Sequence, residues 1–116
     1  MYEAKNISPM IPSFDILKTV SFFTDLLDFT IVRDDKTYAI LHKDNSLVHI
    51  LRAGQDIGEM EFYFEVNSVD EVWNKIKDKL EGIKHKAPFS QDYGMREIHI
   101  LVPQTKTLMF IGQVIR

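Results

Sequence analysis

The chain has 116 residues, 45% of them hydrophobic, which is enough to bury the core of one domain. It contains no cysteine, which excludes disulfides, thiolate metal sites and a thiol nucleophile. The formal net charge is -3 with scattered basic residues, and no signal peptide or apolar run of membrane-spanning length is present, so we expect a cytoplasmic protein that binds neither nucleic acid nor membranes.

The first half of the chain predicts one helix among four strands. Residues 7–14 (ISPMIPSF) favour a strand, whose prolines are typical of an edge. Asp15 is placed to cap a helix over 16–27, because apolar residues recur there at helical spacing. The β-prone runs that follow are 29–32, 37–41 and 47–51, and the turn sequence KDNS joins the last two.

The second half repeats this order. Residues 61–66 (EFYFEV) alternate charged and apolar side chains, as a half-buried strand does. Ser68 and Glu71 form a capping box, and the helix that they begin extends to about Leu80, before Gly82. Three further strands are predicted at 83–86, 97–102 and 107–111.

The order strand–helix–strand–strand–strand therefore occurs twice. We place the first unit at about 5–52 and the second at about 60–114, within a single domain that spans 1–116. Neither unit can cover both faces of its own small sheet, so each needs the other. The predicted fold class is α+β.

Three stretches resemble the vicinal-oxygen-chelate superfamily, which includes glyoxalase I, extradiol dioxygenases and bleomycin resistance proteins. They are PMIPSFDILKTVSFFTDLLDF, FYFEVNSVDEVWNKI and DYGMREIHILVPQTKTLMFIGQ. The likeness covers nearly the whole chain and is greatest to the bleomycin-resistance branch. It implies two βαβββ units whose mixed sheets curl into a cup, in a homodimer that places two cups at the subunit interface.

The resemblance also implies four positions for metal ligands, at Ser8, His49, Glu61 and Met109. The metal-dependent members hold a divalent ion with His, Gln or Glu from the first and last strands of each unit. Ser8 is a poor ligand and the Met109 thioether is soft, so only His49 and Glu61 are suitable. Two ligands are fewer than the three that catalytic zinc or iron sites usually have, so we expect no metal and no cofactor.

The alternative is a third ligand from His42 or His99. Either would be available if the register of its strand differed from the predicted one, since a shift of one residue turns a side chain to the other face. The protein would then be a metal-dependent lyase, isomerase or dioxygenase.

His49 lies between apolar residues in LVHIL. We favour a hydrogen bond to Glu61 across the cup over metal ligation. Such a pair could also bind a cation or a donor group of a ligand.

The stretch DYGMREIHIL places its charged residues on both faces of a strand. Glu97 and His99 share one face with Leu101, while isoleucines occupy the other, and we expect the first set to line the cup. Arg96 points away from Glu97 and His99. It either clamps a carboxylate or phosphate of a ligand or pairs with Glu97 or a nearby acid at the rim of the cup.

Tyr93 and Tyr63 complete the candidate ligand-binding set. An aromatic ring with a polar tip suits the mouth of a pocket, and Gly94 permits a tight turn beside Tyr93. The full predicted set is His49, Glu61, Tyr63, Tyr93, Arg96, Glu97, His99 and Met109, with no catalytic residue.

The sequence thus favours a metal-free protein that sequesters a small drug-like molecule or metabolite in a cup at a homodimer interface. The fold alone does not fix this function, because it supports several activities. Besides a metalloenzyme, a structural or regulatory module whose cup is filled by its own side chains remains open.

Overall fold

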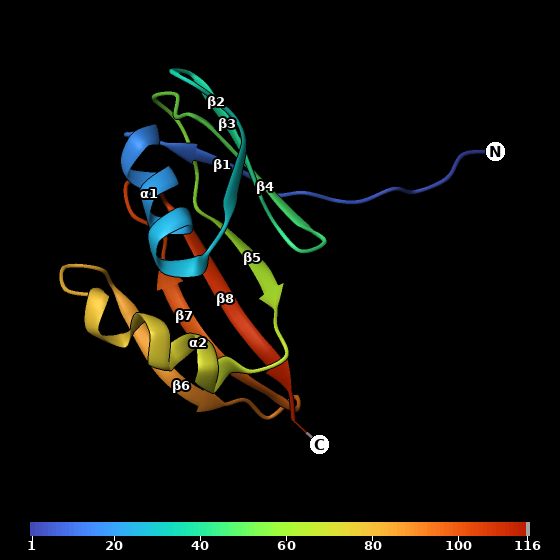
Figure 1. Ribbon diagram of the computed structural model, residues 1–116, viewed down its shortest axis with the longest axis vertical. Coiled ribbons are helices and arrows are strands. Elements are labelled where there is room, and N and C mark those ends of the chain that lie inside the picture. Colours follow the sequence, from blue (N-terminus) through green and yellow to red (C-terminus); the bar gives the residue numbers. More distant parts are fainter. Residues whose placement is uncertain (116) are drawn as a thin grey trace.

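The computed structural model describes residues 1–115 and contains two βαβββ units (Figure 1). Unit one consists of β1 (Met10–Ser13), α1 (Ile16–Leu27), β2 (Thr30–Asp35), β3 (Tyr38–Lys43) and β4 (Ser46–Arg52). Its strands form sheet A in the order β1-β4-β3-β2, with β1 parallel to β4 and the other pairs antiparallel.

Unit two repeats this topology. It consists of β5 (Met60–Glu65), α2 (Val69–Ile76), a 3₁₀ turn (Lys77–Lys79), β6 (His85–Ser90), β7 (Met95–Leu101) and β8 (Thr107–Val114). Sheet B has the order β5-β8-β7-β6, with β5 parallel to β8. The predicted α+β class with two mixed four-stranded sheets is confirmed.

Both helices begin at the predicted caps. The backbone N–H of Lys18 donates to the Asp15 carboxylate at 3.3 Å, and that of Glu71 donates to the Ser68 hydroxyl at 3.2 Å. Each bond satisfies an N–H that has no partner within its helix. After Ile76 the chain tightens into the 3₁₀ turn, so the predicted helix to Leu80 is regular only in its first two turns.

Each helix covers one face of its own sheet, and the two helices contact each other. A chain of aromatic rings connects the units: Phe23 packs against Phe29 at 5.2 Å between centroids, and Phe29 against Phe64 of β5 at 5.6 Å. The core therefore runs through both units, and no helix within the described residues lies on the second face of either sheet.

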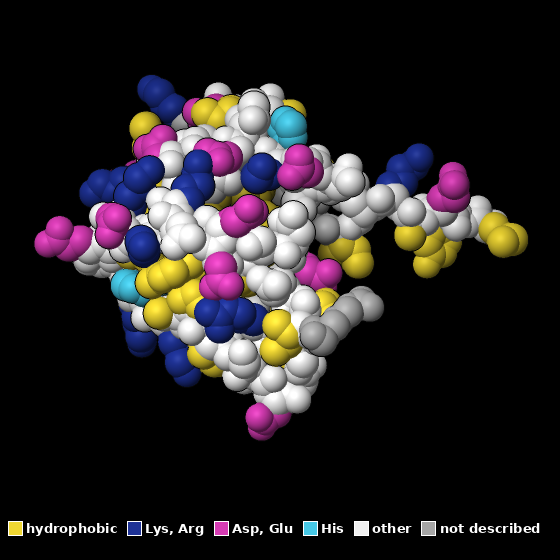
Figure 2. All heavy atoms as spheres, turned by 60° about the horizontal axis from the view of Figure 1, so that its bottom comes forward, with side chains coloured by type: hydrophobic (Ala, Val, Ile, Leu, Met, Phe, Trp, Pro, Cys, Tyr) yellow, Lys and Arg dark blue, Asp and Glu magenta, His cyan; other side chains and the backbone are white. Residues whose placement is uncertain are grey.

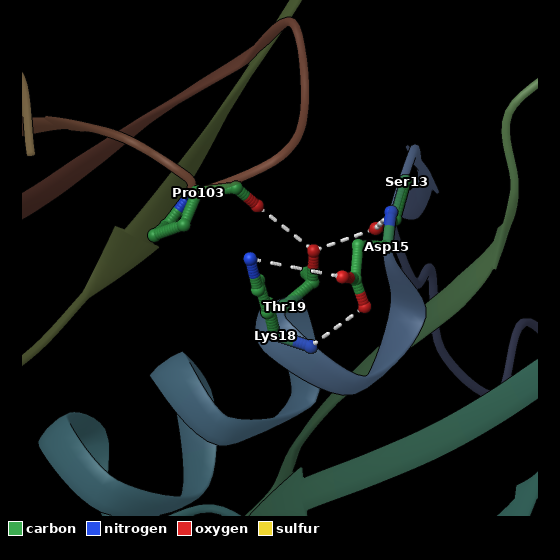
Figure 3. A network of polar contacts seen from close by, with 5 residues as sticks. All are labelled: Ser13, Asp15, Lys18, Thr19 and Pro103. Atoms are coloured by element: carbon green, nitrogen blue, oxygen red, sulfur yellow. Dashed lines mark hydrogen bonds and ion pairs between the residues drawn. The ribbon is translucent and has the colours of Figure 1, made fainter.

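A buried chain of hydroxyl groups also joins the units (Figure 3). The hydroxyl of Thr19 in α1 donates to the carbonyl of Pro103, in the turn between β7 and β8, at 2.8 Å. The Ser13 hydroxyl lies 2.7 Å from that of Thr19 and accepts from the backbone N–H of Asp15. The Phe14 N–H donates to the Gln104 carbonyl, so β1 and α1 are tied to the turn of unit two.

Four strand predictions were wrong in their extent: β2 and β8 each end three residues beyond the predicted bound, and β1 and β6 also differ. The first strand starts at Met10 rather than at residue 7, and residues 1–7 form an exposed arm that extends from the body (Figures 1 and 2). Strand β6 lies at 85–90 instead of 83–86 and includes Pro88. A proline is tolerated there because β6 is an edge strand and its pairing with β7 shifts between Lys86 and Phe89.

No helix within residues 1–115 is long and apolar enough to cross a membrane.

Candidate functional site

The candidate site lies on the face of sheet B opposite α2, which we call the open face of sheet B. Along β7, Ile98 and Ile100 are fully buried toward the helix, as the alternation predicted. Glu97, His99 and Leu101 therefore point to the open face, where Phe110 of β8 and Tyr63 of β5 join them.

Glu97 is the centre of a hydrogen-bond network on this face. Its side chain has no exposed surface, because Tyr63 and Tyr93 lie over it. Both tyrosine hydroxyls donate to Oε2, at 2.9 Å from Tyr63 and 2.6 Å from Tyr93. Oε1 is contacted by Nε2 of Gln91 at 3.2 Å and by Nε2 of His99 at 2.8 Å. Four side chains from three segments thus meet at one carboxylate.

These contacts fix the protonation states of the network. Burial alone would raise the pKa of Glu97, but hydrogen bonds from Tyr93, His99, Gln91 and Tyr63 lower this pKa to about 2. Burial and the hydrogen bond to Glu97 raise the pKa of Tyr63, and the same type of hydrogen bond raises that of Tyr93. At neutral pH the carboxylate is therefore ionised, and both phenols keep their protons.

Beside the network, aromatic rings form a row across the sheet. The His99 ring stacks on Phe110 with 3.9 Å between centroids, and Phe89 of β6 meets the other side of His99 edge-on at 4.9 Å. Tyr63 continues the row beyond Phe110 at 6.2 Å, and Nζ of Lys86 lies 3.9 Å from the centre of the Phe89 ring. The row presents a partly buried aromatic surface whose neighbouring rings are inclined to one another by 27° to 77°, and aromatic surfaces of this kind bind the rings of ligands.

Gly112 of β8 allows Tyr63 to reach Glu97. A side-chain carbon at Gly112 would overlap the hydroxyl and ring of Tyr63. Gly112 of β8 lies between Glu65 of β5 and Glu97 of β7. Because it has no side chain, the phenol of Tyr63 can pass over β8 and reach Glu97.

The open face of sheet A carries the second predicted histidine. Nδ1 of His49 lies 2.6 Å from the hydroxyl of Tyr38 on β3, and the two rings meet edge to face. The predicted bond between His49 and Glu61 was wrong: Glu61 lies on β5 in the other sheet and is exposed. Tyr38 takes the place of Glu61 because it lies two strand positions from His49 on the neighbouring strand.

The four positions predicted for metal ligands do not converge. Met109 is fully buried and faces the helix side of β8, so its predicted place in the cup was wrong by one residue, and Phe110 occupies that face. Ser8 and Met109 instead line a small cavity of about 150 Å³ between the units. Within residues 1–115, no three His, Asp or Glu side chains are grouped so that they could hold a metal ion.

Arg96 lies away from the open face. Its guanidinium pairs with Asp70 at the start of α2, with nitrogen–oxygen distances of 3.0 and 3.3 Å. The interpretation of Arg96 as a ligand clamp in the cup therefore does not fit its position. Arg96 does form an ion pair with an acid, as the alternative predicted, but that acid is Asp70 at the start of α2 and does not lie at the rim of the cup.

Sequence reasoning missed Gln91, Phe89 and Phe110. Phe110 alternates with Met109, so a correct register would have placed it beside His99. Gln91 and Phe89 had no comparable signal, because β6 and its turn were not recognised as part of this surface.

A shallow depression of about 730 Å³ occupies the other end of the open face of sheet B. Glu61, Leu101 and Leu108 line it together with Lys84 and Lys106. The face thus combines an aromatic end, where Glu97 lies, with an apolar end bordered by charges of both signs.

No family model matches the chain. It is 24% identical to the bleomycin resistance protein of Geobacillus stearothermophilus, over 91% of this chain and 95% of that protein. The structure is similar to that of a bleomycin resistance determinant encoded on the transposon Tn5, with a TM-score of 0.79, 22% identity and coverage of 96% and 98% of the two chains. It is also similar to the bleomycin-binding protein of bleomycin-producing Streptomyces verticillus in complex with copper(II)-bleomycin, with a TM-score of 0.77, 18% identity and coverage of 100% and 99%.

Proposed function

We propose that the chain binds and sequesters a small molecule without a metal ion, because its sequence and fold are similar to those of proteins named for bleomycin resistance or bleomycin binding. The observation that carries this proposal is the aromatic row beside Glu97 on a sheet face that no helix covers. The ligand lies against His99, Phe110 and Tyr63, and polar groups at the rim fix its orientation.

The donor set also favours binding over metal chemistry. The imidazole of His99 is engaged with Glu97, and His49 is engaged with Tyr38. The two suitable predicted ligands were His49 and Glu61. Of these, Glu61 is exposed and makes no side-chain hydrogen bond within the described residues, so it alone is available to a metal ion. A single carboxylate does not make the three-ligand site that zinc or non-haem iron enzymes use.

We further propose that a second copy of the chain closes the cup. Each open face carries half-buried apolar side chains, such as Ile40 and Leu51 on sheet A and Leu101 and Leu108 on sheet B. A symmetric dimer would cover these faces and convert two shallow surfaces into enclosed sites.

Isothermal titration calorimetry with bleomycin tests the proposal directly. We expect binding in the micromolar range or tighter, and we expect Phe110→Ala to weaken it roughly two- to tenfold because one stacking ring is lost. Phe14→Ala is the matched control, since Phe14 is an exposed phenylalanine outside this surface. Absence of heat at high micromolar bleomycin would overturn bleomycin as the ligand, and equal effects of the two variants would overturn the site.

A further inference from the structure

We propose that Glu97 turns the open face of sheet B into an array of hydrogen-bond acceptors, so that the site selects planar, uncharged ligands that carry N–H groups. This inference rests on the proposed function, because it specifies the chemistry of the same site. Glu97 acts in it as a positioning residue: it lies beneath its partners and sets which of their atoms carry protons.

The two tyrosines provide the first part of the array. A phenol has one proton, and both Tyr63 and Tyr93 direct theirs to Oε2 of Glu97. Their oxygens can then offer only lone pairs to a ligand. Since both oxygens contact the same carboxylate atom, they are neighbours, and both side chains are substantially exposed, at 41% for Tyr63 and 60% for Tyr93.

His99 provides the second part. An ionised carboxylate only accepts hydrogen bonds, so the 2.8 Å contact with Oε1 requires the proton of the neutral imidazole on Nε2. Nδ1 then carries a lone pair. Within residues 1–115 Nδ1 has no hydrogen-bond partner, and no buried side-chain nitrogen or oxygen there lacks one, so Nδ1 reaches solvent.

The surroundings favour an uncharged donor over a cation. The negative charge of Glu97 is compensated by four hydrogen bonds, and Lys86 lies at the end of the aromatic row, where it repels a cationic ring. A carboxylate or phosphate, in contrast, would set its own lone pairs against those of the tyrosines. Primary amides and amino-substituted heteroaromatic rings combine a planar face with N–H donors, so they match both features.

Two small neutral probes test the selection. Benzamide and acetophenone have nearly the same shape, but the amide NH₂ of the first is a methyl group in the second. In NMR titrations we expect both to shift resonances of β7 and β8, with benzamide binding about fivefold or more tightly, because a site with unpaired acceptors discriminates against a ligand without donors. Equal affinities would overturn the inference.

Glu97→Gln tests the role of the carboxylate. The amide of the variant brings its own NH₂ into the network, so at least one partner must turn a donor outward, and the preference for benzamide should fall toward one. Glu65→Gln is the charge-matched control, because it removes a carboxylate on the same strand as Tyr63 that makes no side-chain hydrogen bond within the described residues. We expect it to keep the wild-type preference, and loss of preference in both variants would overturn a role specific to Glu97.

The tautomer of His99 gives a readout that requires no ligand. In ¹⁵N spectra of the imidazole at pH 8, we expect Nε2 to be protonated and Nδ1 unprotonated. A proton on Nδ1 would overturn the acceptor array even if bleomycin binds. If the tautomer and the benzamide preference are as expected while bleomycin fails to bind, the proposed drug ligand is wrong and the chemistry of the site stands.

Discussion

Glu97 is a carboxylate with no exposed surface, although it lies on the face of its sheet that no helix covers. Burial of an ionised carboxylate without hydrogen-bond partners is costly. Four hydrogen bonds to Glu97 offset this cost, and two of them come from tyrosines that also cover the carboxylate. The network therefore contributes to stability and shapes the binding surface at the same time.

The lowered pKa of Glu97 predicts a loss of stability in acid. Folding lowers the pKa of Glu97 from 4.5 to about 2. A carboxylate of this kind stabilises the fold fully at any pH above its pKa in the unfolded chain. This contribution, about 3 kcal/mol at most, is lost as the pH falls from about 5 toward 2. Urea unfolding at pH 7, 5 and 3 should show a smaller decline for Glu97→Gln than for the wild type. Parallel declines of the two proteins would contradict this assignment, and Glu65→Gln should follow the wild type.

Gly112 offers a second test of the network without a change of charge. In Gly112→Ala the new methyl group would overlap Tyr63, so the phenol must leave Glu97. We expect a loss of about 1–3 kcal/mol in the free energy of unfolding. The pKa of Tyr63, measured by ultraviolet titration, should move down toward its ordinary value. Gly58→Ala is the control, since a methyl group there meets no neighbouring atom, and equal losses in both variants would refute the steric explanation.

At the scale of elements, the sequence predicted best what local chemistry determines. The two helices and their caps at Asp15 and Ser68 depend on residues a few positions apart, and both were located correctly. The face of Met109 and the partner of His49 depend on pairing between distant strands. A shift of one residue exchanges the faces of a strand, so the predicted cup contained Met109 where the structure has Phe110.

The hydroxyl chain between α1 and the β7–β8 turn predicts how strongly the two units are coupled (Figure 3). Thr19→Val keeps the shape of this buried residue but removes its hydroxyl, which leaves Ser13 and the Pro103 carbonyl without their partner. We expect a loss of about 1–3 kcal/mol in the free energy of unfolding, measured with urea. Thr19→Ser retains the hydroxyl and should lose less. A Thr19→Val variant as stable as the wild type would show that water replaces the bonds.

At the scale of the molecule, both sheets have one face that residues 1–115 leave uncovered. Strand β2 is exposed along its whole length, and half-buried apolar side chains lie on the open faces of both sheets. Ligands bound to such open surfaces exchange with water easily, whereas a second copy would enclose them. We therefore propose that the binding function uses a second copy of the chain.

Two substitutions on sheet A test this requirement. Ile40 pairs with His49 and lies on the open face, whereas Ile31 pairs with Leu41 and faces the helix side at the edge of the sheet. Because a buried unpaired charge is strongly unfavourable, Ile40→Glu should convert a dimer into a monomer in sedimentation equilibrium and weaken bleomycin binding in parallel. Ile31→Glu introduces the same charge on a residue that is already 45% exposed, so it should leave the dimer intact. A monomeric wild type that binds bleomycin tightly would show that one open face is sufficient, and a dimer that survives Ile40→Glu would place the subunit contact elsewhere.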